Sequence, residues 1–466
     1  MKKLVQQWLM SLCSVLVLVS CQKERFTDSS QAWLQTSVDS LHFDTVFTTT
    51  GSITQTIKIF NPNKDGIRVS SIRLAGGALS PFKINANGYK GPHISDVEIS
   101  GKDSAYIFVT VNINPTTGNL PFIVRDSIEI SYNGNRQFVQ LDALGQNAHF
   151  LRNKEITGAE TWDSDLPYVI LGRLTVDTNA TLTINKGCKI YMHADAPLIV
   201  HGTLQVNGEK EEDARVLFTG DRLDEPYRFY PGSFPGLVFT DVSKNNRLSF
   251  ATIKNAYQGI TIIDPSPNNS PKLVLEGTII DNAYDAGVLA VNSSISAQNV
   301  LISNCGKNIV LARGGNYQFN HCTVASFSST YLQRKDPVLS VSNYLNSSVP
   351  PADLNALFRN CIFWGDGGGL VKEEVAVVKN GNTAFNVIFD HVLWRVNSNP
   401  ANATITNAIN QDPLFDSVNA SERIYSFRLK EGSPAINKGI YTTTSFDLDG
   451  SKRPVDLPDL GAYERQ

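Results

Sequence analysis

The 466 residues are enough for two or three domains, and 41% apolar with 18% charged residues is the composition of a folded protein, which excludes a disordered chain. The 41 basic and 44 acidic side chains are scattered along the chain and give a formal net charge of −3. Because no polybasic block is present to neutralise phosphates, nucleic acid is excluded as the expected partner.

Residues 1–21 are predicted to be a targeting segment. Two lysines follow the first methionine, the stretch 9–19 is an apolar core too short to span a bilayer, and Leu-Val-Ser-Cys closes the segment at Cys21. This ending resembles the lipobox of bacterial lipoproteins, and the resemblance implies that Cys21 carries lipid. Several acyl chains suffice for stable membrane anchoring. A simple secretory signal is the alternative.

Residues 22–39 are expected to form a polar, flexible tether after the lipid. Lys23-Glu24 partly resembles the charged signal that sends some Bacteroidetes lipoproteins to the cell surface. The expected location is therefore the outer membrane, on its periplasmic side or at the cell surface.

The stretch 40–150 is predicted to be a β-sandwich. Short runs of alternating apolar and polar residues, such as SAYIFVTV from Ser104, are separated by turn residues, and six or seven such strands are typical of that fold. The run FNPNKDGIRVSSIRLAGG from Phe60, with QLDALGQNAHF from Gln140, resembles the immunoglobulin-like module that precedes β-helices in Bacteroidetes lipoproteins. The resemblance implies a spacer or presentation domain.

Five tripeptides of Asp, Ser or Thr, and an apolar residue resemble the sites that Bacteroidetes use for periplasmic O-glycosylation. The alternative is that such a tripeptide begins a strand. The hydroxyl residues of the five sites are Ser40, Thr45, Ser104, Ser127 and Ser417.

One short pattern recurs through residues 248–393: an aliphatic or aromatic start, a small or polar residue, then two apolar residues. Its copies end at Ile253, Ile279, Leu301, Val324, Phe363 and Leu393, in steps of 26, 22, 23, 39 and 30 residues. Near-constant steps with inserted loops indicate a stacked β-solenoid. Turn residues that tolerate a left-handed conformation follow the apolar pairs at Asn255, Asn282, Asn304 and Asp366.

The run YVILGRLTVDTNATLTINKGCKIYMHADAPLIVHGTLQVNG from Tyr168 continues this pattern toward the N-terminus. With the repeat, it resembles right-handed parallel β-helix proteins, a fold that pectate lyases share. The predicted fold class is all-β, with a sandwich followed by a right-handed single-stranded parallel β-helix over residues 151–425. Buried parallel strands explain the Val, Ile and Leu content, and the crossover rule favours the right-handed coil.

Aligning the repeat copies by their end residues places Cys322, Cys361 and His391 in one column. Two cysteines on neighbouring rungs could form a disulfide in an oxidising periplasm. We expect a ladder of buried free thiols instead, because aligned parallel strands point both Cβ atoms the same way. A metal held by all three residues is a further alternative.

Residues 426–466 are predicted to cap the solenoid. The elements DLDG from Asp447 and PDLGAYE from Pro458 resemble the terminal segment of many bacterial β-helix surface proteins. A solenoid must hide its last open rung, so the expected role is capping. Asp447, Asp449, Asp456 and Asp459 are expected to stabilise turns, and a calcium site at Asp447 and Asp449 is the alternative.

Two segments, 221–234 and 328–355, interrupt the coils and are rich in aromatic and charged residues. Loops on a rigid scaffold often carry binding, and aromatic faces beside charged hydrogen-bonding groups suit sugar or uronate recognition. The alternative is that the aromatic residues only pin long loops to the solenoid. The candidate glycan-binding residues are Arg222, Tyr227, Arg228, Tyr230, Tyr331, Arg334 and Tyr344.

These features predict a lipid-anchored envelope protein that is monomeric and non-catalytic, and that binds or displays an extended glycan or acts as an adhesive spacer. No cofactor is expected apart from the calcium alternative. A polysaccharide lyase or glycoside hydrolase acting on an acidic polysaccharide is the competing hypothesis, because carboxylates from different coils can be brought together. The sequence assigns no catalytic residue, since no motif of those enzymes is present.

Overall fold

The computed structural model describes residues 24–48, 51–115, 121–366, 369–454 and 457–465, so Cys21 and Asp456 lie outside the described residues. The chain divides into two compact units, residues 1–147 and 148–466. In the described ranges the helices are the short 3-10 turns η1 (Gly77–Leu79), η2 (Glu212–Ala214) and η3 (Tyr227–Phe229). No helix in this part of the chain is long and apolar enough to cross a membrane.

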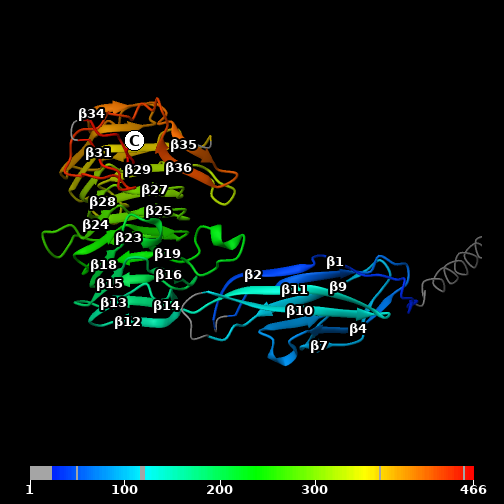
Figure 1. The fold of residues 1–466 in the computed structure, drawn as a ribbon. Helices are drawn as coiled ribbons and strands as arrows, with labels where there is room; N and C mark the ends of the chain where they lie inside the picture. The colour runs from blue at the N-terminus through cyan, green and yellow to red at the C-terminus, as the bar shows by residue number, and fades with distance from the viewer. Residues whose placement is uncertain (1–23, 49–50, 116–120, 367–368, 455–456, 466) are drawn as a thin grey trace, which may run out of the picture. The chain divides into compact units, whose positions relative to one another are not determined.

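The first unit is a β-sandwich, as predicted (Figure 1). A five-stranded sheet has the order β1 (Gln35–Thr36), β3 (Gln55–Phe60), β9 (Ser104–Val111), β5 (Phe82–Ala86) and β6 (Tyr89–Lys90). A six-stranded sheet has the order β2 (Ser40–Phe47), β11 (Asn135–Gln146), β10 (Phe122–Tyr132), β4 (Ile67–Leu74) and β7 (His93–Ile94), with β8 (Val97–Ile99) also paired to β4. Four of these strands have only two or three residues, too few for an alternating pattern to be recognised, which is why the sequence predicts fewer.

The segment from residue 24 to 39 packs onto the sandwich, which corrects the flexible tether predicted for residues 22–39. Leu34 is 1% exposed within the core of the sandwich, and β1 pairs with β3. The side-chain amide of Gln137 donates to the Leu34 carbonyl at 2.8 Å, and that of Asn133 donates to the Thr27 carbonyl at 2.9 Å. Burial of one leucine and these backbone contacts hold a segment whose composition is mostly polar.

Truncation of Leu34 tests this packing. We expect Leu34→Ala to lower the free energy of unfolding of the sandwich by about 2–4 kcal/mol, because it leaves a cavity in the core. The neighbouring Trp33→Ala is the control, since Trp33 is 52% exposed and its loss should cost far less. Urea denaturation followed by circular dichroism measures both, and equal small effects would contradict the packed segment.

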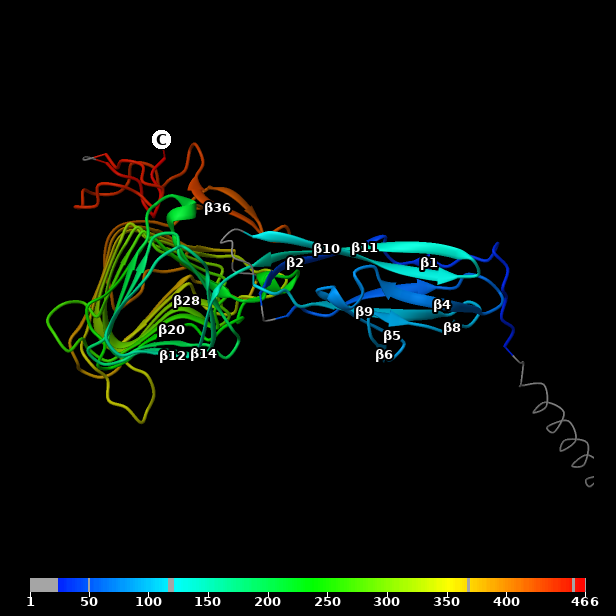
Figure 2. The ribbon, with the colours of Figure 1, turned by 60° about the horizontal axis from the view of Figure 1, so that its bottom comes forward.

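The second unit is a right-handed parallel β-helix whose strands pair in parallel from rung to rung and define three faces (Figures 1 and 2). The first face contains β13 (Ala159–Trp162), β15 (Thr181–Asn185), β18 (Thr203–Asn207), β21 (Asn246–Ser249) and β24 (Leu273–Glu276), then parts of β26 (Ala286–Gln298), β28 (Lys307–Asn320), β31 (Leu354–Gly365), β33 (Phe385–Trp394) and β34 (Thr404–Ile409). The second face contains parts of β12 (His149–Ile156) and β14 (Tyr168–Val176), then β16 (Lys189–Met192), β19 (Val216–Gly220), β22 (Ala251–Lys254), β25 (Ile279–Asp281), β27 (Leu301–Ser303), β29 (Thr323–Ser326) and the ends of β31 and β33. The third face contains the ends of β12 and β14, then β17 (Leu198–Val200), β20 (Leu237–Phe239), β23 (Gln258–Ile263), the starts of β26 and β28, β30 (Leu339–Ser342) and β32 (Val375–Val378).

Inward side chains of the three faces form one continuous core. Phe319, Phe358 and Phe389 stack in one column, with ring centroids 5.4 and 5.0 Å apart. Such stacking follows from the constant parallel register, which places equivalent residues of successive rungs directly beside each other.

The register shifts three copies of the predicted repeat by one residue. Ile280, Ile302 and Trp394 occupy the positions that the sequence analysis gives to Ile279, Leu301 and Leu393. The latter three point outward, yet they are apolar because the C-terminal segment packs on them. When both the inward and the outward residues of a strand are apolar, apolar and polar residues no longer alternate along it. The alignment of the repeat copies depends on that alternation, so it can slip by one residue.

The corrected register separates His391 from the two cysteines. Cys361 pairs with Val392, whereas His391 lies at the corner with φ of 55°. Cys322 and Cys361 remain adjacent, because the residues that follow them, Thr323 and Ile362, pair. Both cysteines are free and buried, so the predicted ladder of free thiols is confirmed.

The C-terminal segment packs along the side of the coils (Figure 2), which corrects the capping role predicted for residues 426–466. The solenoid ends with β34 at residue 409 and not at 425, and among the described strands β34 pairs only with β33. β35 (Phe415–Asn419) and β36 (Ile424–Leu429) form an antiparallel hairpin. The segment covers outward apolar residues of successive rungs of the second face, which include Leu301, Ile362 and Leu393.

Candidate functional site

Two loops leave the solenoid at the same corner, between the second and third faces. The first loop, residues 221–236, connects β19 to β20 and contains η3. The second loop, residues 327–338, connects β29 to β30. Because both follow second-face strands, stacking places them on one side of the coil, a point that the sequence alone leaves open.

Asparagine corners hold the first loop in place. Asn255 and Asn282 adopt left-handed φ angles of 65° and 56°, as the turn chemistry predicts. The Asn255 amide donates to the Arg228 carbonyl and the Asn282 amide donates to the Phe229 carbonyl, each at 2.9 Å. The Asn282 amide also donates to the Asn255 side-chain oxygen at 2.8 Å, so successive corners form a ladder under the loop.

The two loops meet through their tyrosines. The Tyr227 and Tyr230 rings lie 5.1 Å apart, and Tyr230 lies 4.7 Å from Tyr331 of the second loop, both at tilted angles. Tyr227 is 44% exposed. The structure therefore places three predicted glycan-binding residues in one partly exposed aromatic surface.

Three arginines flank this surface. Arg222 lies 4.0 Å from the Tyr227 ring centroid and forms a bidentate pair with Asp224 at 2.7 and 2.8 Å. Arg228 lies 5.2 Å from the centroid of Phe229. We call Arg222, Tyr227, Arg228, Phe229, Tyr230, Tyr331 and Arg423 the aromatic-arginine cluster.

Arg423 is a member that the sequence analysis missed. It lies in the turn between β35 and β36 with φ of 57°, its guanidinium is 3.8 Å from the Phe229 ring centroid, and it donates to the Tyr331 hydroxyl at 3.2 Å. No motif in the sequence singles out this arginine, because its contacts come from loops about 90 and 190 residues away, brought near only by the stacking of rungs.

A pocket of about 120 Å³ adjoins the cluster, and its lining includes Tyr191, Arg222, Arg228, Lys254 and Thr219. Three cationic and four hydroxyl side chains line this small cavity, a composition that suits a carboxylate or sulfate. Asp221 leads into the first loop from β19, where its carboxylate contacts the His193 ring at 2.6 Å. Burial raises the pKa of the Asp221 carboxyl, and the contact with His193 opposes that shift.

Two of the predicted binding residues lie outside the cluster. Arg334 is 1% exposed and pairs at 2.5 Å with Glu374, which is fully buried, so it anchors the second loop and is not accessible to a glycan. Tyr344 follows β30 at a different corner and lines a separate pocket of about 400 Å³. These are corrections: the segment 328–355 contains β30 and two loops, and sequence spacing does not show which of its charged residues is buried.

The terminal aspartates stabilise turns. Asp447 accepts hydrogen bonds from the backbone N–H groups of Asp449, Ser451 and Glu464 at 3.0, 2.6 and 2.8 Å. Asp459 accepts from the backbone N–H groups of Asn437 and Arg465. Within the described ranges, no group of three or more His, Cys, Asp and Glu side chains could hold a metal ion. The observed arrangement is the turn-stabilising one.

Three described carboxylates near the cluster have structural partners. Asp221 contacts His193, Asp224 pairs with Arg222, and Asp281 accepts hydrogen bonds from Ser303 and Asn304 at 2.7 and 3.1 Å.

No protein-family model matches the chain, and no curated protein matches it. A family 123 glycoside hydrolase from Clostridium perfringens matches 27% of this chain, which spans about a quarter (26%) of that enzyme, with 13% identity and a TM-score of 0.19. WR4, an MSP family member of C. elegans, matches 24% of this chain over 98% of its own length, with 10% identity and a TM-score of 0.17. The catalytic unit of a GH87 alpha-1,3-glucanase from Streptomyces thermodiastaticus strain HF3-3 matches 76% of this chain over 88% of its own length, with 10% identity and a TM-score of 0.19.

Substitution of Arg334 tests its reassignment from ligand contact to anchor. We expect Arg334→Ala to lower the free energy of unfolding by about 3–5 kcal/mol, because Glu374 would remain as an unpaired buried charge. Lys335→Ala is the control, since it removes the same charge from an exposed neighbouring position. Thermal or urea denaturation measures the difference, and a fully stable Arg334→Ala protein would show that the pair does not anchor the loop.

Proposed function

We propose that this chain is a lipid-anchored protein of the bacterial outer membrane that binds an extended acidic glycan through the aromatic-arginine cluster without modifying it. The observation that carries the proposal is the meeting of three distant segments at one surface, where Tyr227, Tyr230 and Tyr331 adjoin Arg228 and Arg423.

The chemistry of the cluster fits an acidic sugar. The apolar faces of sugar rings pack on aromatic rings, and guanidinium groups form strong, often bidentate hydrogen bonds with carboxylates. Neither Arg228 nor Arg423 has an ion-pair partner among the described residues, so both charges are available to a ligand. The adjoining pocket adds Lys254 as a third positive group without an ion-pair partner in that same part of the chain.

The polymeric nature of the ligand follows from the scaffold. Rungs at constant spacing give a long wall rather than an enclosed cavity, and the cluster spans the rungs from β19 to β29. Such a surface suits several consecutive sugar units. The lipobox ending at Cys21 supports membrane attachment, and the sandwich supports a role as a spacer between the lipid and the solenoid.

Binding of polygalacturonate, an extended uronate polymer, tests the proposed function. We expect Tyr230→Ala and Arg423→Ala each to weaken binding about tenfold, because they remove a stacking face and a charge-assisted contact. Tyr441→Ala is the control, since Tyr441 is an exposed tyrosine outside the cluster. Calorimetric titration of folded variants measures the change, and unaltered affinity in both cluster variants would overturn the assignment of this surface.

Membrane attachment through Cys21 is tested separately. We expect Cys21→Ala to move the protein from the membrane fraction to the soluble fraction, because the substitution removes the acylated side chain. Fractionation followed by a carbonate wash measures the distribution. Cys13→Ala, in the same targeting segment, is the control, and retention of the Cys21→Ala protein after the wash would contradict the anchor.

A further inference from the structure

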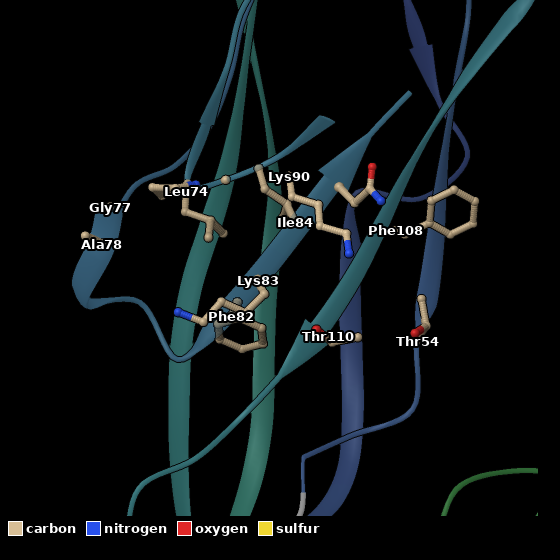
Figure 3. Close-up of a pocket in the computed structure, with 13 residues that line it drawn as sticks. Thr54, Leu74, Gly77, Ala78, Phe82, Lys83, Ile84, Lys90, Phe108 and Thr110 are labelled. Carbon is tan, nitrogen blue, oxygen red and sulfur yellow. The ribbon is translucent and has the colours of Figure 1, made fainter. Parts of the chain in front are cut away.

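The sandwich contains a cavity larger than the pocket at the solenoid cluster (Figure 3). It has a volume of about 750 Å³ and is lined by residues of β4, β5, β6 and β9 and by the loops beside them. Its lining includes Lys83, Asn85, Lys90 and Phe108. Leu74, Phe82 and Ile84 also line it, but their side chains are buried in the core of the sandwich. A volume of this size is in the range of small-molecule and cofactor sites, about 300–1,000 Å³.

Strand alternation explains the chemistry of this cavity. On β9, Ile107 and Val109 point into the sandwich core, whereas Phe108 points outward and is 43% exposed. Asn85 of β5 pairs with Phe108 on one side and with Lys90 of β6 on the other. The register therefore places an exposed aromatic ring, an amide and an ammonium group in one row on the outer face of the sheet.

The charge of the cavity has one sign. Lys83 and Lys90 are exposed, and none of the lining residues is acidic. In the described parts of the chain, neither lysine has an ion-pair partner. The loop at the rim contains Gly77, which has φ of 56° and open space on the side where a Cβ would lie, and the exposed Ala78, so small residues leave the entrance open.

We infer that this cavity is a second binding site, specific for a uronate sugar residue, with Phe108 as the stacking face and Lys83 and Lys90 as the carboxylate contacts. An exposed aromatic ring gives the apolar face of a sugar a surface to pack on. Two unpaired ammonium groups with no acidic neighbour in the lining favour an anion over a neutral sugar. The Asn85 side chain supplies hydrogen-bonding capacity for a hydroxyl group.

This site deepens the proposed function, because two glycan sites on one chain would let an extended uronate polymer bind by avidity. The sandwich site also stands without the solenoid cluster, since the two share no residue and belong to different compact units. The experiment must therefore measure each site in the absence of the other.

Titration of the full-length chain with a short oligogalacturonate separates the two sites. The solenoid cluster is first disabled by Tyr230→Ala with Arg423→Ala, and we expect one binding event to remain. Adding Lys83→Ala with Lys90→Ala should weaken that event at least about tenfold. Lys58→Ala removes a charge from the same sheet face outside the cavity lining and should leave the affinity unchanged.

A charge introduced at the rim gives a second test that leaves both lysines in place. Ala78→Glu should weaken oligogalacturonate binding, because it adds a negative group beside the bound carboxylate, whereas the similarly sized Ala78→Gln should not. Methyl-esterified oligogalacturonate should bind more weakly than the acid. The sandwich site is wrong if the Lys83→Ala, Lys90→Ala variant binds as tightly as its parent protein. It is also wrong if no binding remains once the solenoid cluster is disabled. Loss of binding at the solenoid cluster alone bears only on the proposed function.

Discussion

Parallel hydrogen bonding at a constant register is the constraint on which the solenoid depends. A rung can stack on the next only if both turn their corners at the same place, so the corner conformation repeats whatever residue occupies it. The corner between the first and second faces has φ between 47° and 56° in six successive rungs, at Phe250, Gly277, Asn299, His321, Asn360 and His391. A left-handed Phe is unfavourable locally, so at Phe250 stacking outweighs local preference.

The other corner connects this constraint to the candidate site. Asn255 and Asn282 adopt the left-handed conformation at this corner. The side-chain amide of each also donates a hydrogen bond to a backbone carbonyl of the first loop. A glycine would turn the corner equally well but would leave the loop unsupported. The loop that presents Tyr227 and Tyr230 thus takes its position from the backbone geometry of the rungs beneath it.

Much of this fold can be predicted from the sequence, because the apolar residues of both units recur at regular spacings. The repeat predicts the parallel coil, Asn255 and Asn282 predict its corners, and the alternation in residues 40–150 predicts a sandwich. The candidate site is harder to predict. Tyr230 and Tyr331 stand out as aromatic residues in loops, but nothing local to Arg334 or Arg423 shows that one is buried against Glu374 and the other reaches Tyr331.

The reason lies in where each contact comes from. Periodicity reports which side of its own strand a residue occupies, and so it identifies the inward columns. It does not report contacts between segments that stacking brings together. Those contacts determine whether an arginine is buried in an ion pair or joins the cluster. The outward apolar residues Ile279, Leu301 and Leu393 show the same effect, since only their cover, the C-terminal segment, explains why they are apolar.

That segment has a consequence for the cluster, because it carries the hairpin that supplies Arg423. Arg428 of β36 forms a bidentate pair with Asp449 at 2.7 Å for both contacts, and its guanidinium lies 4.8 Å from the Tyr463 ring centroid. The DLDG turn and the PDLGAYE stretch therefore hold β36 from one side, while Phe427 packs among the outward residues of the rungs on the other. A terminal segment that capped the last rung would leave this hairpin far from the first loop. Packed along the second face, it places Arg423 on Phe229, so the same residues that shield the side of the coils also complete the proposed glycan surface.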